Sequence, residues 1–101
     1  MLCGKYLVGS KLDFREVDYG VIGSVSDYKN SSCIIVKTLN PDYYLLFGSV
    51  KLVITESGSA LSHLSIVARE QGIPVFLLDK PLREIKKNGK LSISDNCVKV
   101  I

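Results

Sequence analysis

The residue of this sequence best suited to chemistry is His63, the single histidine among 101 residues. It follows a small, polar loop (residues 56–60) and precedes an amphipathic stretch, so we expect it in the first turn of a helix with Ser62 as N-cap. Free backbone N–H groups and the positive end of the helix dipole favour a phosphate there. The same positive end disfavours the imidazolium ion, and a neutral ring has a lone pair for attack on phosphorus. The pattern predicts a nucleophilic histidine at a phosphate-binding helix end.

The loop before His63 is expected to support this chemistry. Small residues at Gly58, Ser59 and Ala60 leave room for a bulky phosphoryl donor, and the hydroxyls of Ser59 and Ser62 are placed to bind phosphate oxygens or to fix the ring. Position alone leaves an alternative open. A histidine near a helix start is also often a cap or a partly buried packing residue.

The helix that carries His63 is predicted over residues 62–71, because apolar side chains recur at helical spacing and Gly72 then ends it. Asn40 and Pro41 indicate a shorter helix over residues 41–47, and one or two helical turns are expected over residues 81–85. Strands are predicted at residues 5–8, 21–26, 33–38, 51–55 and 75–78, with a closing hairpin of residues 90–94 and 97–101. This order favours a mixed α/β domain with layered sheets and flanking short helices.

Size and composition limit the function classes. A chain of 101 residues with 47% hydrophobic residues fits one folded domain, here taken as residues 1–101. The net charge of +3 is too small to indicate a nucleic-acid partner, and we interpret the basic cluster of Arg83, Lys86, Lys87 and Lys90 as a solvated helix end and turn. No apolar run is long enough to span a membrane. We therefore expect neither nucleic acid nor membrane as partner.

The cysteines indicate a reducing compartment. Cys3, Cys33 and Cys97 are odd in number, far apart and in apolar surroundings, which is typical of reduced, buried thiols in the cytoplasm. Metal ligation is not expected, because there is no CxxC pair and His63 is far in sequence from every cysteine.

Residues 55–74 resemble the active segment of the mobile, or swivelling, domain of phosphoenolpyruvate-utilising enzymes. That domain occurs in phosphoenolpyruvate synthase, pyruvate phosphate dikinase, enzyme I of the sugar phosphotransferase system and rifampicin phosphotransferase, and its pattern is roughly T-E-x-G-G-x-T-S-H-x-x-I-x-A-R-E-x-G-I-P. The matching residues are Thr55, Glu56, Gly58, Ser62, His63, Ile66, Ala68, Arg69, Glu70, Gly72, Ile73 and Pro74.

Two positions depart from the pattern. Ser59 replaces the second glycine, which either stiffens the loop or adds a hydroxyl near the phosphate. Leu61 replaces a threonine and removes a hydroxyl partner of the imidazole, although rifampicin phosphotransferases tolerate an apolar residue there. Arg69 matches, but lies about 600° around the helix from His63, so an ion pair with Glu56, Glu70 or a neighbouring domain is slightly favoured over phosphate binding. Glu56 either orients the imidazole or solvates the loop.

The resemblance implies the swivelling β/β/α fold and a phosphocarrier function. His63 would be the catalytic residue, phosphorylated transiently, with Gly58, Ser59, Ser62, Glu56 and Arg69 in support. The phosphoryl group would move between an ATP-grasp domain and a phosphoenolpyruvate, pyruvate or other acceptor site, in the same polypeptide or on separate subunits. The domain itself would bind no cofactor; ATP or phosphoenolpyruvate would be the donor, with magnesium on partner domains. The chain is not expected to turn over substrate alone.

Two other functions compete with this interpretation. One is a non-catalytic interaction module that keeps the fold without phosphotransfer, which Leu61 supports. The other is a cysteine hydrolase built on His63 and one thiol, although no nucleophile motif is recognisable in the sequence.

Overall fold

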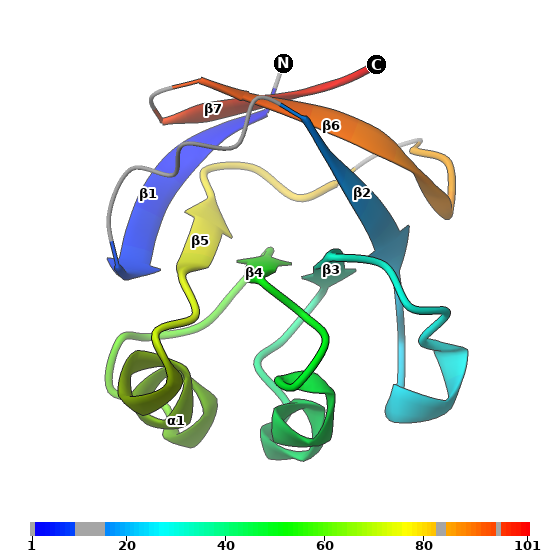
Figure 1. The fold of residues 1–101 in the computed structure, drawn as a ribbon. Coiled ribbons are helices and arrows are strands. Elements are labelled where there is room, and N and C mark those ends of the chain that lie inside the picture. Colours follow the sequence, from blue (N-terminus) through cyan, green and yellow to red (C-terminus); the bar gives the residue numbers. More distant parts are fainter. Residues whose placement is uncertain (1, 10–15, 83–84, 95) are drawn as a thin grey trace.

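The computed structural model describes residues 2–9, 16–82, 85–94 and 96–101, in which the strands close into one barrel (Figure 1). Around the barrel the order is β1-β5-β4-β3-β2-β6-β7. The strands are β1 (Leu2–Val8), β2 (Glu16–Val21), β3 (Cys33–Val36), β4 (Leu52–Thr55), β5 (Val75–Leu78), β6 (Asn88–Ser94) and β7 (Cys97–Val100). The helical elements are the 3-10 helices η1 (Val25–Asp27) and η2 (Pro41–Leu46) and the α-helix α1 (His63–Gln71). The molecule is a small α/β domain made mostly of strands.

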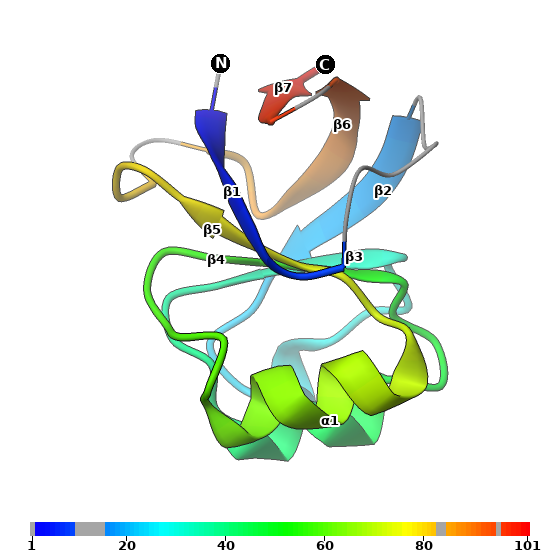
Figure 2. The same ribbon diagram turned by 90° about the vertical axis from the view of Figure 1, so that its left-hand side faces the viewer.

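Strands β2, β3, β4 and β5 pair in parallel, whereas β1, β6 and β7 join them through antiparallel pairs. The carboxyl ends of the four parallel strands therefore share one edge of the barrel. Helices α1 and η2 lie side by side against the outer face of β3, β4 and β5, as Figure 2 shows. The loop that leaves β4 at its carboxyl end leads directly to the start of α1.

Strand β3 shows why its sequence is continuously apolar. Cys33 and Ile35 pack inside the barrel, whereas Ile34 and Val36 pack against the helices, and all four side chains are buried. The prediction of a strand buried on both faces is confirmed. The barrel interior and the layer between barrel and helices thus form two separate cores.

Most predicted elements are confirmed, including α1, the short helix after Asn40, strand β5 and the closing hairpin of β6 and β7. The strand predicted at residues 21–26 is wrong, because β2 ends at Val21 and η1 follows. The Asp27 carboxylate accepts hydrogen bonds from the backbone N–H groups of Gly23 (2.9 Å) and Ser24 (3.1 Å). These bonds stabilise a turn where the sequence predicted a continuing strand.

One further expectation about the fold is wrong, and another is tested only in part. The sheets were expected in layers, but the described strands form a closed barrel with helices outside it. Of the helical turns expected at residues 81–85, residues 83 and 84 lie outside the described part, and Pro81, Leu82 and Ile85 are not helical. Among the described helices, none has the length and apolar character needed to cross a membrane.

The expectation that all three cysteines are reduced thiols is wrong for two of them. Cys3 and Cys97 form a disulfide between β1 and β7, where they are direct register partners. Cys33 remains a free thiol with no exposed surface, as expected. The disulfide links residues 94 positions apart at the seam that closes the barrel. The barrel's closure, which the sequence spacing does not reveal, brings the two cysteines together.

Candidate active site

His63 is the first residue of α1 and its side chain is exposed. Ser62 caps the helix with extended backbone angles (φ −65°, ψ 154°), and its hydroxyl accepts a hydrogen bond from the Ser65 N–H at 3.2 Å. At the other end Gly72 adopts the left-handed conformation (φ 71°) and ends the helix. The predicted position of His63, in the first turn behind a serine cap, is confirmed.

A chain of serine hydroxyls fixes this helix end. The Ser62 hydroxyl donates to Ser65 Oγ at 2.9 Å, and Ser65 Oγ donates to the Ser59 carbonyl at 2.7 Å. Ser65 has no exposed surface, so its hydroxyl serves only these internal bonds. Sequence reasoning missed Ser65; the available signal was a polar residue three positions after the N-cap, where capping motifs place a partner. Ser62 therefore acts as a cap and network member, and its hydroxyl is already occupied.

The loop residues Gly58 and Ser59 take roles other than those expected. Gly58 has φ of 150°, and a Cβ there would come within 2.5 Å of Leu39 Cδ1. Its missing side chain thus makes room for Leu39 of the chain itself, not for a donor. Ser59 Oγ accepts a hydrogen bond from the Leu61 N–H at 3.1 Å, so the serine stiffens the loop.

The start of the loop is held on the end of β3. Thr55 is fully buried, and its Oγ1 donates to the Ser57 carbonyl at 2.7 Å. Both the backbone N–H (3.1 Å) and the hydroxyl (2.9 Å) of Ser57 donate to the Lys37 carbonyl. The segment from β4 to α1 is therefore anchored at both ends before any ligand binds.

Glu56 and Arg69 are not brought together with His63. The Glu56 carboxylate accepts a hydrogen bond from the Leu82 N–H and none from the imidazole, so it neither orients the ring nor merely solvates the loop. Arg69 is exposed in the last turn of α1, and within the described residues neither Glu56 nor Glu70 forms an ion pair with it. Neither of those two expected pairings is present in the structure.

Around His63 the surface is open and partly apolar. Leu61 is 84% exposed, and Ile66, one helical turn after His63, is 45% exposed. Within the described part of the chain, the backbone N–H groups of His63 and Leu64 have no hydrogen-bond acceptor. The arrangement presents an imidazole next to two unpaired donors at the positive end of a helix, which suits a phosphate held at or on the ring.

The thiols do not complete a hydrolase site. Cys3 and Cys97 are bonded to each other, and Cys33 is fully buried in the barrel. Burial raises the pKa of the Cys33 thiol far above its usual range, because the thiolate would lose its hydration. The cysteine-hydrolase alternative is therefore excluded. Among the described residues, no group of three or more His, Cys, Asp and Glu side chains is placed to hold a metal ion.

Comparison with known proteins finds phosphotransferases and a phosphoenolpyruvate synthase among the similar proteins. The chain is 33% identical over 70 residues to the uncharacterized phosphotransferase YvkC of Bacillus subtilis (strain 168), which covers 69% of this chain and 8% of that protein. It is 29% identical over 63 residues to a probable phosphoenolpyruvate synthase of Staphylothermus marinus, covering 62% and 8%. It is 26% identical over 65 residues to rifampicin phosphotransferase of Bacillus subtilis (strain 168), covering 64% and 8%.

These relatives are much larger proteins, of which the aligned region makes up only 8% in each case. The family model for the mobile domain of PEP-utilising enzymes matches residues 28–94, which include β3, β4, the loop of residues 56–62 and α1. The chain therefore belongs to the family of PEP-utilising enzyme mobile domains.

Proposed function

We propose that this chain is a phosphocarrier domain in which His63 accepts a phosphoryl group and passes it on. The observation that carries the proposal is the placement of the single histidine, exposed, at the amino end of a serine-capped helix with two unpaired backbone N–H groups beside it. Membership of the family and the phosphotransferases among its relatives support the same function.

The transfer step follows from this placement. A ring nitrogen of His63 attacks the terminal phosphorus of the donor, an N–P bond forms, and the P–O bond to the leaving group breaks with its electron pair on oxygen. ADP leaves if ATP is the donor, and the enolate of pyruvate leaves if phosphoenolpyruvate is the donor. The N–H groups of His63 and Leu64 stabilise the phosphate oxygens. Attack by an acceptor then reverses the bond changes and frees the imidazole.

The serine network positions the nucleophile in this proposal. Because Ser62, Ser65 and Ser59 are joined by hydrogen bonds, the helix end and the loop keep one arrangement when the ring changes its charge and size. Ser65 is therefore a positioning residue, buried behind the surface that a donor would approach.

The partners follow from the same proposal. We infer that the domain swivels between an ATP-grasp domain and a site for phosphoenolpyruvate, pyruvate or another acceptor, in the same polypeptide or on separate subunits. The relatives' much greater length supports additional domains as partners. Magnesium would act on those domains with the donor. The exposed Leu61 and Ile66 would then form part of the contact around the histidine.

A second candidate function is a binding module without phosphotransfer. The observation that favours it is Leu61, which lacks the family's hydroxyl and is 84% exposed two residues before His63. A carrier and a binding module differ in one property, since only the carrier forms a covalent phosphohistidine.

Incubation of the chain with a partner phosphotransferase and either [γ-32P]ATP or [32P]phosphoenolpyruvate tests the proposal and identifies the donor. The expected label is acid-labile and base-stable, and it is absent from His63→Ala. An acid-stable label would favour the binding module. So would the absence of label from both donors, provided that the partner enzyme phosphorylates its own carrier in the same mixture.

A further inference from the structure

The barrel is least extensively paired at the seam between β1 and β7. Among the described residues these two strands are in register at two positions, Leu2 with Val98 and Cys3 with Cys97. Every other pair of neighbouring strands is in register at three positions or more. One of the two pairs at the seam is the disulfide itself. The covalent bond is therefore a large part of the connection that closes the barrel.

Each strand of the seam is also held on its other side. Strand β1 has four register partners in β5, and the Asp79 N–H donates to the Cys3 carbonyl at 2.8 Å. Strand β7 has four register partners in β6. Across the seam, the Gly4 N–H donates to the Asn96 carbonyl at 2.9 Å. If the seam opened, β1 would stay with β5 and β7 with β6, and the barrel would become a curved open sheet.

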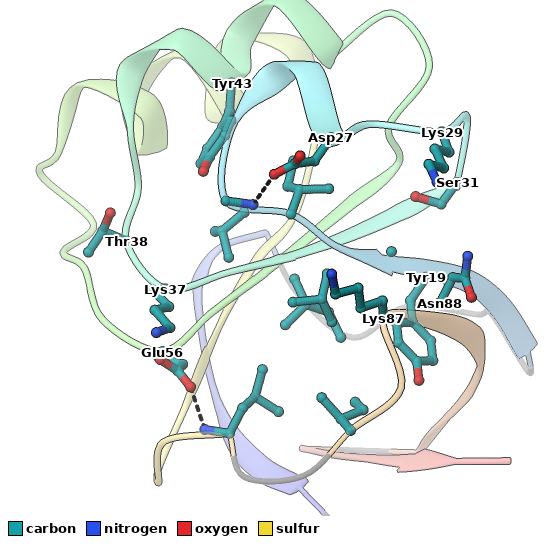
Figure 3. Close-up of a pocket in the computed structure, with 18 of the residues that line it drawn as sticks. Tyr19, Asp27, Lys29, Ser31, Lys37, Thr38, Tyr43, Glu56, Lys87 and Asn88 are labelled. Atoms are coloured by element: carbon teal, nitrogen blue, oxygen red, sulfur yellow. Dashed lines mark hydrogen bonds between the residues drawn. The ribbon is translucent and has the colours of Figure 1, made fainter.

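An open seam would expose the interior of the barrel. In the strand order β3 is the fourth of seven, so it faces the seam across that interior. Cys33 of β3 belongs to the interior core and has no exposed surface. The cavity of about 720 Å³ in Figure 3 has Tyr19, the register partner of Cys33, among the described residues that line it, but not Cys33. This cavity therefore gives no route to the thiol while the barrel is closed.

We propose that the Cys3–Cys97 disulfide is a redox switch, in which reduction by a dithiol opens the seam between β1 and β7 and gives access to the barrel interior. Both cysteines are partly exposed, so a reductant can reach the bond in the folded chain. With the bond reduced, one register pair and the Gly4 hydrogen bond are left to hold the described part of the seam. Local opening occurs where so few contacts hold a segment.

The redox step is a thiol–disulfide exchange. A thiolate of the dithiol attacks one sulfur of the disulfide and forms a mixed disulfide, while the displaced cysteine sulfur takes the electron pair and then a proton. The second thiol of the reductant attacks the mixed disulfide and releases the other cysteine. The chain gains two electrons and two protons, and the dithiol becomes a disulfide.

The switch is separate from the histidine site. Figure 1 shows the seam on the side of the barrel away from α1 and η2. The reduced chain should therefore keep α1 and the serine network that precedes His63. The proposal stands on the strand pairing alone and does not depend on phosphorylation of His63.

Two measurements by mass spectrometry test the switch. Dithiothreitol without denaturant should reduce the disulfide, so that iodoacetamide then labels Cys3 and Cys97. The second measurement compares the oxidised parent with the double variant Cys3→Ser, Cys97→Ser, because Cys33 is the single free thiol of each. At pH 9 we expect iodoacetamide to label Cys33 at least about tenfold faster in the double variant.

Amide hydrogen exchange separates opening of the seam from a general loss of stability. The increase in rate in the double variant should be at least about tenfold larger at Gly4 than at Ile73, whose N–H donates to the Ala68 carbonyl at 2.8 Å. Cys33→Ala keeps the disulfide and should keep the parent's rate at Gly4.

Three results would each overturn the proposal. One is a disulfide that dithiothreitol leaves intact in the folded chain. Another is labelling of Cys33 at the same rate in the oxidised parent and the double variant. The third is an increase in amide exchange by the same factor at Gly4 and Ile73, which would show a uniform loss of stability in place of an open seam.

Discussion

The hydroxyl of Ser62 lies 2.9 Å from that of Ser65 and also accepts the Ser65 N–H at 3.2 Å, and these two contacts join the cap of α1 to a residue with no exposed surface. Ser65 passes the bond on to the Ser59 carbonyl at 2.7 Å, so the residue before His63 is tied to the loop that precedes it. The position of the exposed imidazole thus depends on a buried hydroxyl.

Ser65→Ala should lower both stability and the rate of histidine phosphorylation. The variant leaves the Ser59 carbonyl and the Ser62 hydroxyl without their buried partner, which should cost about 1–2 kcal/mol in the free energy of unfolding. Urea unfolding measures the first effect, and the rate of phosphorylation by a small chemical donor measures the second. Ser49→Ala, at an exposed serine, is the matched control. Equal phosphorylation rates in the two variants would remove Ser65 from the positioning role.

Gly58→Ala should destabilise the domain, whereas Gly48→Ala should not. Gly58 has φ of 150° and a new Cβ would lie 2.5 Å from Leu39 Cδ1, while Gly48 has nothing within 4 Å. We expect a loss of about 1–3 kcal/mol for Gly58→Ala and a change within about 0.5 kcal/mol for Gly48→Ala. Thermal or urea unfolding of the two variants decides the point. Similar stabilities would mean that the loop before His63 does not hold Gly58 in this conformation.

The Cys3–Cys97 disulfide should stabilise the barrel by closing a long loop in the unfolded chain. The two residues are 94 positions apart, and constraint of so long a loop is worth about 2–5 kcal/mol. The double variant Cys3→Ser, Cys97→Ser should therefore unfold at a lower urea concentration than the oxidised parent. Cys33→Ala serves as a comparison that leaves the disulfide in place. Addition of a reductant should lower the stability of the parent and leave that of the double variant unchanged.

Cys33 should resist alkylation across the pH range in which ordinary thiols react. The thiolate is the reactive form, and burial raises the pKa of Cys33, so its thiolate fraction stays low as the pH rises from 7 to 9. Iodoacetamide should label no cysteine in the oxidised native chain at pH 7 or at pH 9, and one cysteine after unfolding in urea. Intact mass gives the count directly. Rapid labelling of the folded chain at pH 9 would contradict the burial of this thiol.

The parts of the fold that sequence reasoning predicted are those governed by local signals. Ser62 and Gly72 mark the ends of α1 through capping chemistry, and the apolar run of β3 marks a strand buried on both faces. In β2, exposed Glu16 and Asp18 alternate with buried Val17 and Tyr19, so this strand lacks the continuous apolar run that marks β3. Its register is set by β3 and β6, which are distant in sequence.

The site, like the fold, was predicted only where local sequence signals determine it. The position of His63 followed from one capping residue and one loop, both adjacent to it in the chain. The disulfide, the partner of Glu56 and the cavity depend on barrel closure, which brings residues such as Cys3 and Cys97 together from opposite ends of the chain. Sequence spacing carries no information on contacts of that kind.

The most direct test of the central claim is chemical phosphorylation of the chain by phosphoramidate, followed by 31P NMR. This donor needs no partner protein, and His63 is the single histidine, so any phosphohistidine signal belongs to it. The account predicts one signal in the phosphohistidine region, lost in acid, kept in base and absent from His63→Ala. A folded chain that gives no such signal, or gives the same signal after His63→Ala, would contradict it.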